Sequence, residues 1–262
     1  MSKSFREATI FLLLRYNEEG ICDAEFFLLA IFRSVSKSES NQRKLLFSIS
    51  GRKIMIQIEG FVTGIAQENC YLIHNEQNLL IVDPGSEGDR LVQEIKRIGK
   101  TPRAILLTHT HYDHIGAVEQ LRNKYGVPVY VSPLEQKWLG DPILNLSGLG
   151  RHDNMPDLIV QPAEYEFEMK EYTIGGMTFE VIPTPGHSIG SVSFLFDDFV
   201  VVGDALFKGS IGRSDLYTGD MQQLLYSIKN YLFTLPRELP AYPGHGDATT
   251  IGHEVDTNPF FN

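Results

Sequence analysis

A cluster of histidines and one aspartate has the residue types and spacing of a metal site. Thr108–His114 reads Thr-His-Thr-His-Tyr-Asp-His, so four potential metal ligands fall within six residues. Imidazole nitrogens and carboxylate oxygens are common ligands of zinc, iron and manganese. A lone histidine in a loop is most often an ordinary polar residue, but a solvated loop seldom concentrates nitrogen donors in this way. The pattern therefore predicts a metal centre.

The segment before these ligands predicts the element that positions them. Ala104–Leu107 is an apolar run, and such a run followed by polar residues is typical of a buried strand ending in a site loop. His109 and His111 are two residues apart, so an extended backbone points both imidazoles to one side. Asp113 and His114 lie where the next helix is predicted to begin. Ligands from two directions suit a pair of adjacent metal ions.

The H-x-H-x-D-H motif resembles the signature of the metallo-β-lactamase superfamily, which implies further ligands at the ends of later strands. By this resemblance His109, His111 and His187 hold one metal ion, Asp113, His114 and His245 hold the other, and Asp204 bridges both. Asp83, after another predicted strand, is expected to support the site from outside the ligand set. The resemblance implies two divalent ions, with zinc expected and iron or manganese as alternatives.

Strand and helix patterns place these residues in a layered fold. Leu91–Ile98 and Ile115–Tyr125 have the apolar spacing of helices, each followed by a glycine, and Val127–Val131 reads as a strand. Alternation of strand, helix and strand favours an α/β fold. The resemblance implies a four-layer αββα sandwich, the metallo-β-lactamase fold. His74, in a predicted hairpin, is expected to be exposed, and Glu166–Met169 is expected to be a strand.

Strand patterns that fit this fold begin near Met55. Residues 1–53 contain two apolar clusters, Ile10–Leu14 and Phe26–Phe32, and no pattern there indicates chemistry. We therefore divide the chain into an N-terminal extension at 1–53 and a hydrolase domain of the metallo-β-lactamase fold at 54–262. The extension is interpreted as an appendage or as the product of a misplaced start codon.

Composition and charge limit the classes of partner. The chain has 262 residues, 42% of them hydrophobic, which suffices for one large core. Its 33 acidic and 23 basic residues give a net charge of −10, without a long basic stretch, which disfavours nucleic acid. No apolar run approaches the ~18 residues of a membrane span. Two cysteines provide no disulfide framework, and we predict a cytoplasmic protein of undetermined oligomeric state.

The full ligand set resembles that of glyoxalase II and its short relatives. This resemblance implies a hydrolase in which a hydroxide bridging two metal ions attacks a small-molecule acyl thioester or a related acyl substrate. Asp113 and Asp204 are then catalytic as well as metal-binding. β-Lactamase activity is not expected, because those enzymes carry a non-carboxylate residue at the place of Asp204.

The sequence differs from glyoxalase II in two respects, so the resemblance does not decide the identity of the substrate. The chain ends at Asn262, soon after His245, without the C-terminal helical domain that helps glyoxalase II bind glutathione. Arg213, a candidate substrate-binding residue, stands at the place of a lysine, and Asp215 replaces a tyrosine. S-lactoylglutathione, a smaller thioester and another acyl ester all remain candidates.

The Gly212–Asp215 stretch also resembles the persulfide dioxygenases of the superfamily. These enzymes hold one iron through residues that match His109, His187 and Asp204 here. A 2-His-1-carboxylate site suits O₂ chemistry, so a mononuclear iron dioxygenase is the alternative to the hydrolase. A non-catalytic metal-binding protein is a second alternative, disfavoured because no ligand is replaced.

Overall fold

The computed structural model describes residues 55–148 and 156–261. These belong to one compact unit, Ile54–Asn262. The predicted extension at 1–53 lies outside the described residues, so its interpretation stays a prediction. Within the described ranges, no helix combines the length and the apolar character needed to cross a bilayer.

Two six-stranded sheets form the framework. The first has the order β1-β2-β3-β4-β5-β6, in which β1 to β3 pair antiparallel and β3 to β6 pair parallel. Its strands are Gln57–Thr63, Glu68–His74, Asn78–Val82, Thr101–Leu106, Val129–Val131 and Tyr165–Glu166. The expected strand at Glu166–Met169 is thus wrong in extent, because β6 ends at Glu166, although the Phe167 amide still donates to the Val131 carbonyl of β5 at 2.8 Å.

The second sheet has the order β14-β13-β10-β9-β8-β7. Its strands, from β7, are Glu171–Ile174, Met177–Pro183, Val192–Leu195, Val200–Gly203, Pro240–Pro243 and Thr249–Thr250. Only the β10–β13 pair is parallel among the neighbours described in this sheet. A separate two-stranded ribbon joins β11 (Leu206–Phe207) to β12 (Ser210–Ile211).

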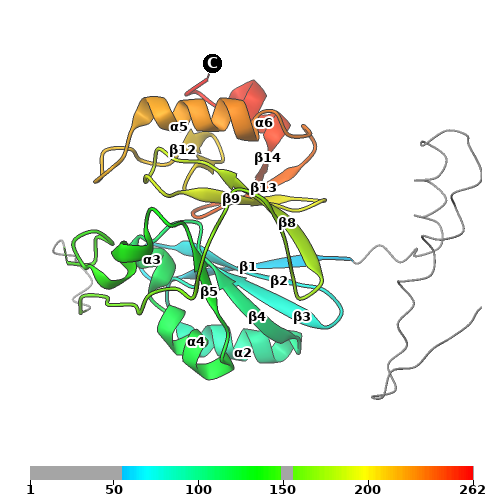
Figure 1. The fold of residues 1–262 in the computed structure, drawn as a ribbon. Helices are drawn as coiled ribbons and strands as arrows, with labels where there is room; N and C mark the ends of the chain where they lie inside the picture. Colours follow the sequence, from blue (N-terminus) through cyan, green and yellow to red (C-terminus); the bar gives the residue numbers. More distant parts are fainter. Residues whose placement is uncertain (1–54, 149–155, 262) are drawn as a thin grey trace, which may run out of the picture. The chain divides into compact units, whose positions relative to one another are not determined.

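Helices cover the outer face of each sheet (Figure 1). α2 (Gly88–Ile98) and α4 (Val118–Tyr125) lie on the first sheet, and α5 (Met221–Ser227) and α6 (Ile251–Thr257) lie on the second. The short α3 (Tyr112–Ile115) lies at one end of the sandwich. Single turns occur at η2 (Gln136–Gly140) and η3 (Ile228–Leu232). The predicted four-layer αββα sandwich is confirmed.

Alternation along the strands divides the core into layers. In β3, Leu79 and Ile81 pack toward the helices, whereas Leu80 and Val82 pack between the sheets. Both faces of this strand are therefore buried from Leu79 to Val82, which explains why these four residues are all apolar. His74, expected to be exposed, is buried at the end of β2 with its Nε2 3.4 Å from Glu59 Oε1. That expectation was wrong, because β2 is covered on both sides.

Candidate metal centre

The predicted ligands come from strand ends in both sheets. His109 and His111 follow β4, and Asp113 and His114 lie in α3, which begins directly afterwards. Each remaining ligand follows a strand of the second sheet, namely His187 after β8, Asp204 after β10 and His245 after β13. The fold therefore gathers residues that are far apart in sequence at one end of the space between the sheets.

Three histidines form one group of potential metal ligands. Ligand atoms of His109, His111 and His187 all lie within 4.8 Å of one another. The Nε2 of His187 is 2.9 Å from Nδ1 of His111, and the ring centroids of His109 and His111 are 4.6 Å apart. All three side chains are buried. This group matches the first metal site expected from sequence.

The second group contains a carboxylate and is closer to solvent. Ligand atoms of Asp113, His114 and His245 also lie within 4.8 Å of one another. His245 Nε2 is 3.3 Å from Asp113 Oδ2, and these two side chains are 26% and 17% exposed. His114 is fully buried. A substrate would therefore approach from the side of Asp113 and His245.

Asp204 lies between the two groups. Its Oδ1 is 3.4 Å from His114 Nε2, and its Oδ2 is 3.5 Å from both His187 Nε2 and His245 Nε2. One carboxylate thus faces histidines of both groups, and its Oδ2 alone lies near one histidine of each group. This arrangement fits a residue shared by two cations.

Hydrogen bonds on the far sides of the rings orient the histidines. Asp83 is buried and accepts bonds from the Thr108 amide at 2.7 Å and the Thr108 hydroxyl at 2.6 Å. Its Oδ2 also lies 3.1 Å from His114 Nδ1. With Nδ1 donating to Asp83, Nε2 of His114 presents a lone pair to the cluster. This geometry supports the outer role assigned to Asp83 from sequence, although Asp83 also lies close enough to His109 and His114 to form a further ligand group.

Two other rings are oriented by backbone carbonyls. His187 Nδ1 lies 2.7 Å from the carbonyl oxygen of Arg213, and His245 Nδ1 lies 3.1 Å from that of Ala66. A carbonyl only accepts, so each Nδ1 donates and each Nε2 faces the centre. Arg213 thus contacts the site through its backbone.

Buried ligand atoms that lack a hydrogen-bond partner indicate that the centre suits a cation. Among the described residues, Nε2 of His109 and of His114 and Oδ1 of Asp204 are buried without a hydrogen-bond partner. Such atoms are costly unless something binds them. Burial favours the uncharged form of Asp204, yet His114, followed by His245 and His187, outweighs burial and holds its pKa well below the usual range. The ligand set fits divalent ions, because three histidines form one group, one carboxylate and two histidines form the other, and the Asp204 carboxylate lies between them.

Gly244 lets the backbone pass close to this cluster. A Cβ at Gly244 would lie 2.1 Å from Asp204 Oδ1 and 2.8 Å from Cε1 of His114. No side chain fits at such distances without displacing the Asp204 carboxylate. The requirement for glycine just before His245 is therefore steric.

Glu135 is a functional candidate that the sequence interpretation missed. Its carboxylate is completely buried and accepts hydrogen bonds from the Thr110 amide at 2.8 Å and the Gly190 amide at 2.8 Å. Burial raises the pKa of Glu135, and the bonds it accepts partly oppose this. One signal was available, because Glu135 shares a helical face with Trp138 and Leu139, which places a charged residue on an apolar face.

The candidate substrate-binding residue Arg213 is already paired. Its Nε donates to Asp215 Oδ1 at 2.7 Å and its terminal nitrogen donates to Oδ2 at 2.9 Å. Both side chains are mostly exposed. The guanidinium therefore has a partner within its own loop, which makes it a weaker candidate for binding a substrate anion.

The segment that carries the ligands matches a known protein family. Residues 63–245, which span all of the predicted ligands, match the family described as the Metallo-beta-lactamase superfamily. The chain belongs to the metallo-β-lactamase superfamily.

Members of the superfamily with curated descriptions include metallo-hydrolases. A Streptococcus pyogenes protein described as a probable metallo-hydrolase is 49% identical over 213 residues, which cover 80% of this chain and 92% of the relative. The Haemophilus influenzae hydroxyacylglutathione hydrolase GloC is 36% identical over 201 residues, covering 75% of this chain and 93% of that protein. These descriptions and the donor set agree on metal-dependent hydrolysis.

Solved structures of the superfamily share the fold closely. The crystal structure of BLEG-1, described as a B3 metallo-beta-lactamase, superposes with a TM-score of 0.75 at 43% identity, covering 79% of this chain and 100% of that one. TTHA1623, solved in a di-iron-bound form, gives a TM-score of 0.67 at 39% identity, and the match covers 77% of this chain and 99% of that one. A structure that is 39% identical to this chain thus contains two iron ions.

Proposed function

We propose that the protein is a binuclear metal-dependent hydrolase that cleaves acyl thioesters. The observation that carries this proposal is the position of Asp204, whose two oxygens lie 3.4–3.5 Å from histidine nitrogens of both ligand groups. A single-ion site would need only one of these groups. All seven side chains expected to hold the two ions are close together, and the 36% identity to GloC supports a thioester substrate.

In such a reaction the residues of the chain would bind the metal ions, compensate their charge and orient the histidine rings. His109, His111 and His187 would hold one ion, and Asp113, His114 and His245 the other, with Asp204 shared. When bound, divalent cations lower the pKa of water to about 7 and polarise a carbonyl group. Asp113 and Asp204 balance the positive charge, and Asp83 holds the His114 ring in place. A thiolate is a good leaving group, so thioester cleavage needs little help from a protein acid.

Metal content and substrate profile test this proposal together. Zinc is the ion we expect, with iron or manganese as alternatives, and elemental analysis of protein purified without added metal should find about two ions per chain. The loaded protein is then assayed with S-lactoylglutathione, a simple acyl thioester and a β-lactam. The β-lactam is included because BLEG-1 is described as a metallo-beta-lactamase. Faster cleavage of the β-lactam than of either thioester would contradict the proposal.

An Asp113→Ala variant separates the proposal from its alternatives. Asp113 belongs to the group that a mononuclear dioxygenase would not need, so its loss should remove one ion and abolish thioester hydrolysis. One iron per chain, unchanged in Asp113→Ala, would favour a persulfide dioxygenase instead. Two ions without turnover of any substrate would favour a non-catalytic metal-binding protein. We also propose a cytoplasmic location and expect no nucleic-acid or membrane partner.

A further inference from the structure

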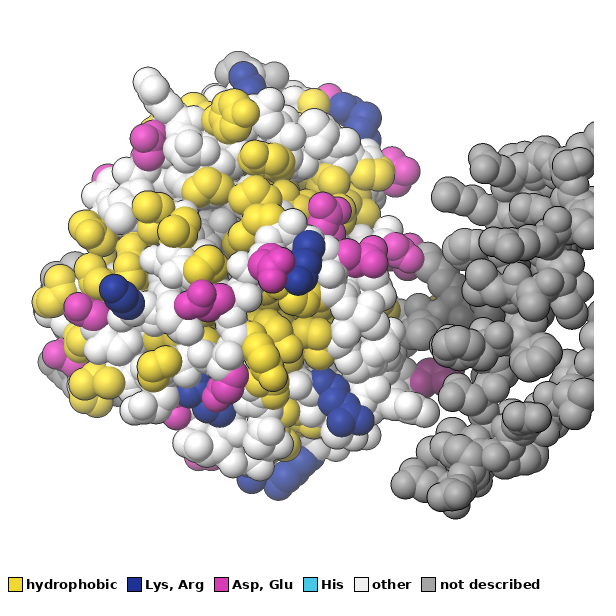
Figure 2. Space-filling model, in the orientation of Figure 1, with side chains coloured by type: hydrophobic (Ala, Val, Ile, Leu, Met, Phe, Trp, Pro, Cys, Tyr) yellow, Lys and Arg dark blue, Asp and Glu magenta, His cyan; other side chains and the backbone are white. Residues whose placement is uncertain are grey.

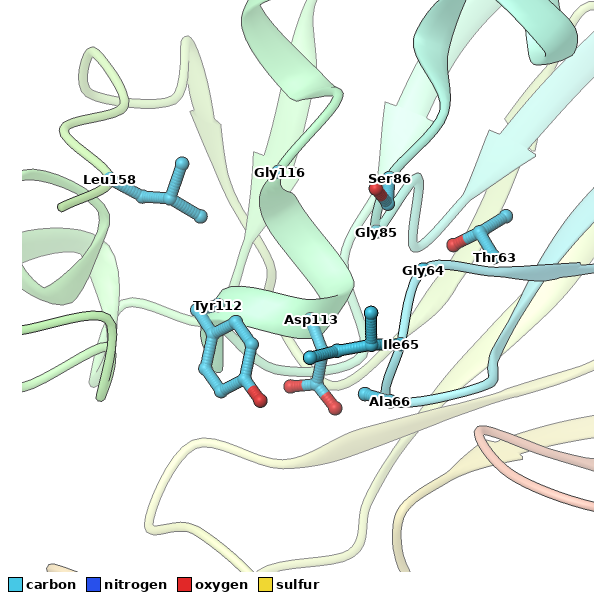
Figure 3. Close-up of a pocket in the computed structure, with 10 residues that line it drawn as sticks. All are labelled: Thr63, Gly64, Ile65, Ala66, Gly85, Ser86, Tyr112, Asp113, Gly116 and Leu158. Atoms are coloured by element: carbon cyan, nitrogen blue, oxygen red, sulfur yellow. The ribbon is translucent and has the colours of Figure 1, made fainter. Parts of the chain in front are cut away.

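The loop that carries His245 follows a strand of the second sheet, but hydrogen bonds from the first sheet hold it. His245 comes directly after β13, and an isolated β-bridge pairs it with Glu68 at the start of β2. Its ring is oriented by the Ala66 carbonyl, in the turn between β1 and β2. Figure 3 shows this turn beside Asp113, another ligand assigned to the same ion. The second metal group is therefore assembled across the space between the sheets.

Asn69 donates three hydrogen bonds to this loop. Its backbone amide donates to the Gly244 carbonyl at 2.7 Å. Its side-chain nitrogen donates to the carbonyls of Pro243 at 3.0 Å and Gly246 at 2.8 Å, so the acceptors lie on both sides of His245. An amide nitrogen has two protons, and both are used here. Asn69 is 6% exposed, so water competes little for these bonds.

Tyr71 donates a further bond to the same loop. Its hydroxyl lies 2.6 Å from the Pro243 carbonyl oxygen, and the residue is buried. Because residues two apart in a strand point to the same side, Asn69 and Tyr71 both face the second sheet. The Pro243 carbonyl is therefore bound by two buried side chains of the opposite sheet.

The position of this loop affects the shared carboxylate as well as His245. Gly244 approaches so closely that a Cβ there would lie 2.1 Å from Asp204 Oδ1. His245 Nε2 lies 3.3 Å from Asp113 Oδ2 and 3.5 Å from Asp204 Oδ2. A loop shift of ~1 Å would change these distances by more than the ~0.2 Å that a metal site tolerates.

We propose that Asn69, assisted by Tyr71, is a positioning residue for the second metal ion. Donors from β2 hold the carbonyls on either side of His245 and thereby fix the distance of its ring from Asp113 and Asp204. The three-histidine group has no member in this loop, so loss of these donors should weaken one ion and spare the other. The inference rests on the proposed two-ion hydrolase and names the residue that sets the affinity of its second ion.

An asparagine at the other end of β2 provides a matched control. Asn75 is 8% exposed, and its side-chain nitrogen donates at 2.9 Å to the carbonyl of Gly175, in the turn between β7 and β8. Asn69→Asp and Asn75→Asp each remove donors from a buried contact between the two halves of the sandwich. The first contact adjoins a metal ligand and the second does not. A role in fold stability alone would therefore appear in both variants.

Zinc titration of the metal-free full chain against a chelating dye measures the affinity of each ion. We expect Asn69→Asp to raise the Kd of the second ion at least about tenfold and that of the first by less than about twofold. The added negative charge would by itself favour a cation, so weaker binding would reflect the lost donors. The visible spectrum of bound cobalt identifies the group that each ion occupies. An unchanged second Kd in Asn69→Asp, or an equal rise in Asn75→Asp, would overturn the inference.

Ions bound at the surface must not be counted as the second ion. Acidic side chains are scattered over the face shown in Figure 2. The titrations are therefore run with added salt, which screens weak binding of zinc or cobalt to exposed carboxylates.

Tyr71→Phe decides the question if Asn69→Asp fails to fold. This variant removes one hydroxyl and should raise the Kd of the second ion at least about threefold, as expected for one hydrogen bond. Tyr172→Phe is its control, because the Tyr172 hydroxyl accepts a bond from the Glu168 amide rather than binding the loop of His245. A second Kd unchanged in Tyr71→Phe would then overturn the inference.

Hydrogen exchange separates this inference from the proposed function. In metal-free protein, the peptide around His245 should exchange at least about threefold faster in Asn69→Asp than in the wild type, while the peptide around His187 keeps its rate. That result without turnover of any thioester would contradict the proposed reaction alone. If the wild-type chain bound a single ion, the proposed function would fall and this exchange measurement would decide the positioning role. Equal exchange around His245 in both proteins would overturn it.

Discussion

The carboxylate of Glu135 accepts a hydrogen bond from the backbone amide of Thr110, the residue between His109 and His111. Its other oxygen accepts from the amide of Gly190 and the hydroxyl of Ser188, in the loop that carries His187. A Cβ at Gly190 would lie 2.7–2.9 Å from atoms of the Glu135 side chain, so the loop can approach only as glycine. One buried carboxylate therefore ties together the two loops of the three-histidine group.

Replacing Glu135 by glutamine should loosen this group. The amide nitrogen of glutamine would face a donor that the carboxylate now satisfies, and the unpaired donor would lower the free energy of unfolding by about 1–3 kcal/mol. We expect weaker metal binding by the three histidines, measured by metal titration and by the visible spectrum of the cobalt-substituted protein. Glu166→Gln, an exposed change in β6, serves as the control. An unaltered cobalt spectrum in Glu135→Gln would contradict a positioning role.

Substituting Gly244 should disturb both metal groups. The Cβ of Gly244→Ala would lie 2.1 Å from Asp204 Oδ1, so the shared carboxylate must move. We expect metal affinity to fall by at least about tenfold, in the range seen when residues that orient ligands are changed. Gly140→Ala is a suitable control, because the nearest atom to its Cβ would be Val160 O at 3.7 Å. Equal metal affinity in both variants would show that the backbone adjusts.

Removing metal should lower thermal stability. The centre buries several donors without partners, and a ligand that binds only the folded state stabilises it by about 2.7 kcal/mol when present at a hundred times its Kd. Differential scanning fluorimetry should show a lower Tm after chelation and recovery when zinc is added. His187→Ala removes a ligand from the three-histidine group and should shrink the zinc-dependent shift. The same shift in that variant would argue against the assigned ligand set.

A chain that begins at Met55 should fold and keep its activity. The compact unit Ile54–Asn262 holds every predicted ligand, and the superfamily match covers residues 63–245. We expect the circular dichroism spectrum, the Tm and the metal content of the shortened chain to match those of the full chain. Aggregation together with loss of metal binding would show that residues 1–53 contribute to the domain.

The sequence was most informative where ligands are adjacent or follow apolar strands. The spacing of His109 to His114 predicts a metal site by itself, because the donors lie on one loop. His187 and His245 carry no local signal and were found through the family resemblance. Glu135 was missed because its partners, Thr110 and Gly190, come from separate loops that only the packed sheets bring together.

Other features depend on tertiary contacts that no local pattern records. The bonds from Asn69 to the loop of His245 join segments that are distant in sequence. The extent of β6 was also overestimated, since its length is decided by pairing with β5 rather than by propensity. By contrast, strand and helix periodicities are local, so a layered α/β domain could be predicted from them, whereas the four-layer arrangement was implied by the family resemblance.

Each of the two groups assigned to a metal ion combines residues that follow β4 with a single histidine from the second sheet. During synthesis the H-x-H-x-D-H motif therefore leaves the ribosome well before either completing histidine. Non-local contacts of this kind form late in folding because they require a long loop to close. A product truncated before β13 lacks His245 and cannot assemble the second group. Binding of both metal ions therefore requires that the chain has been synthesised through His245.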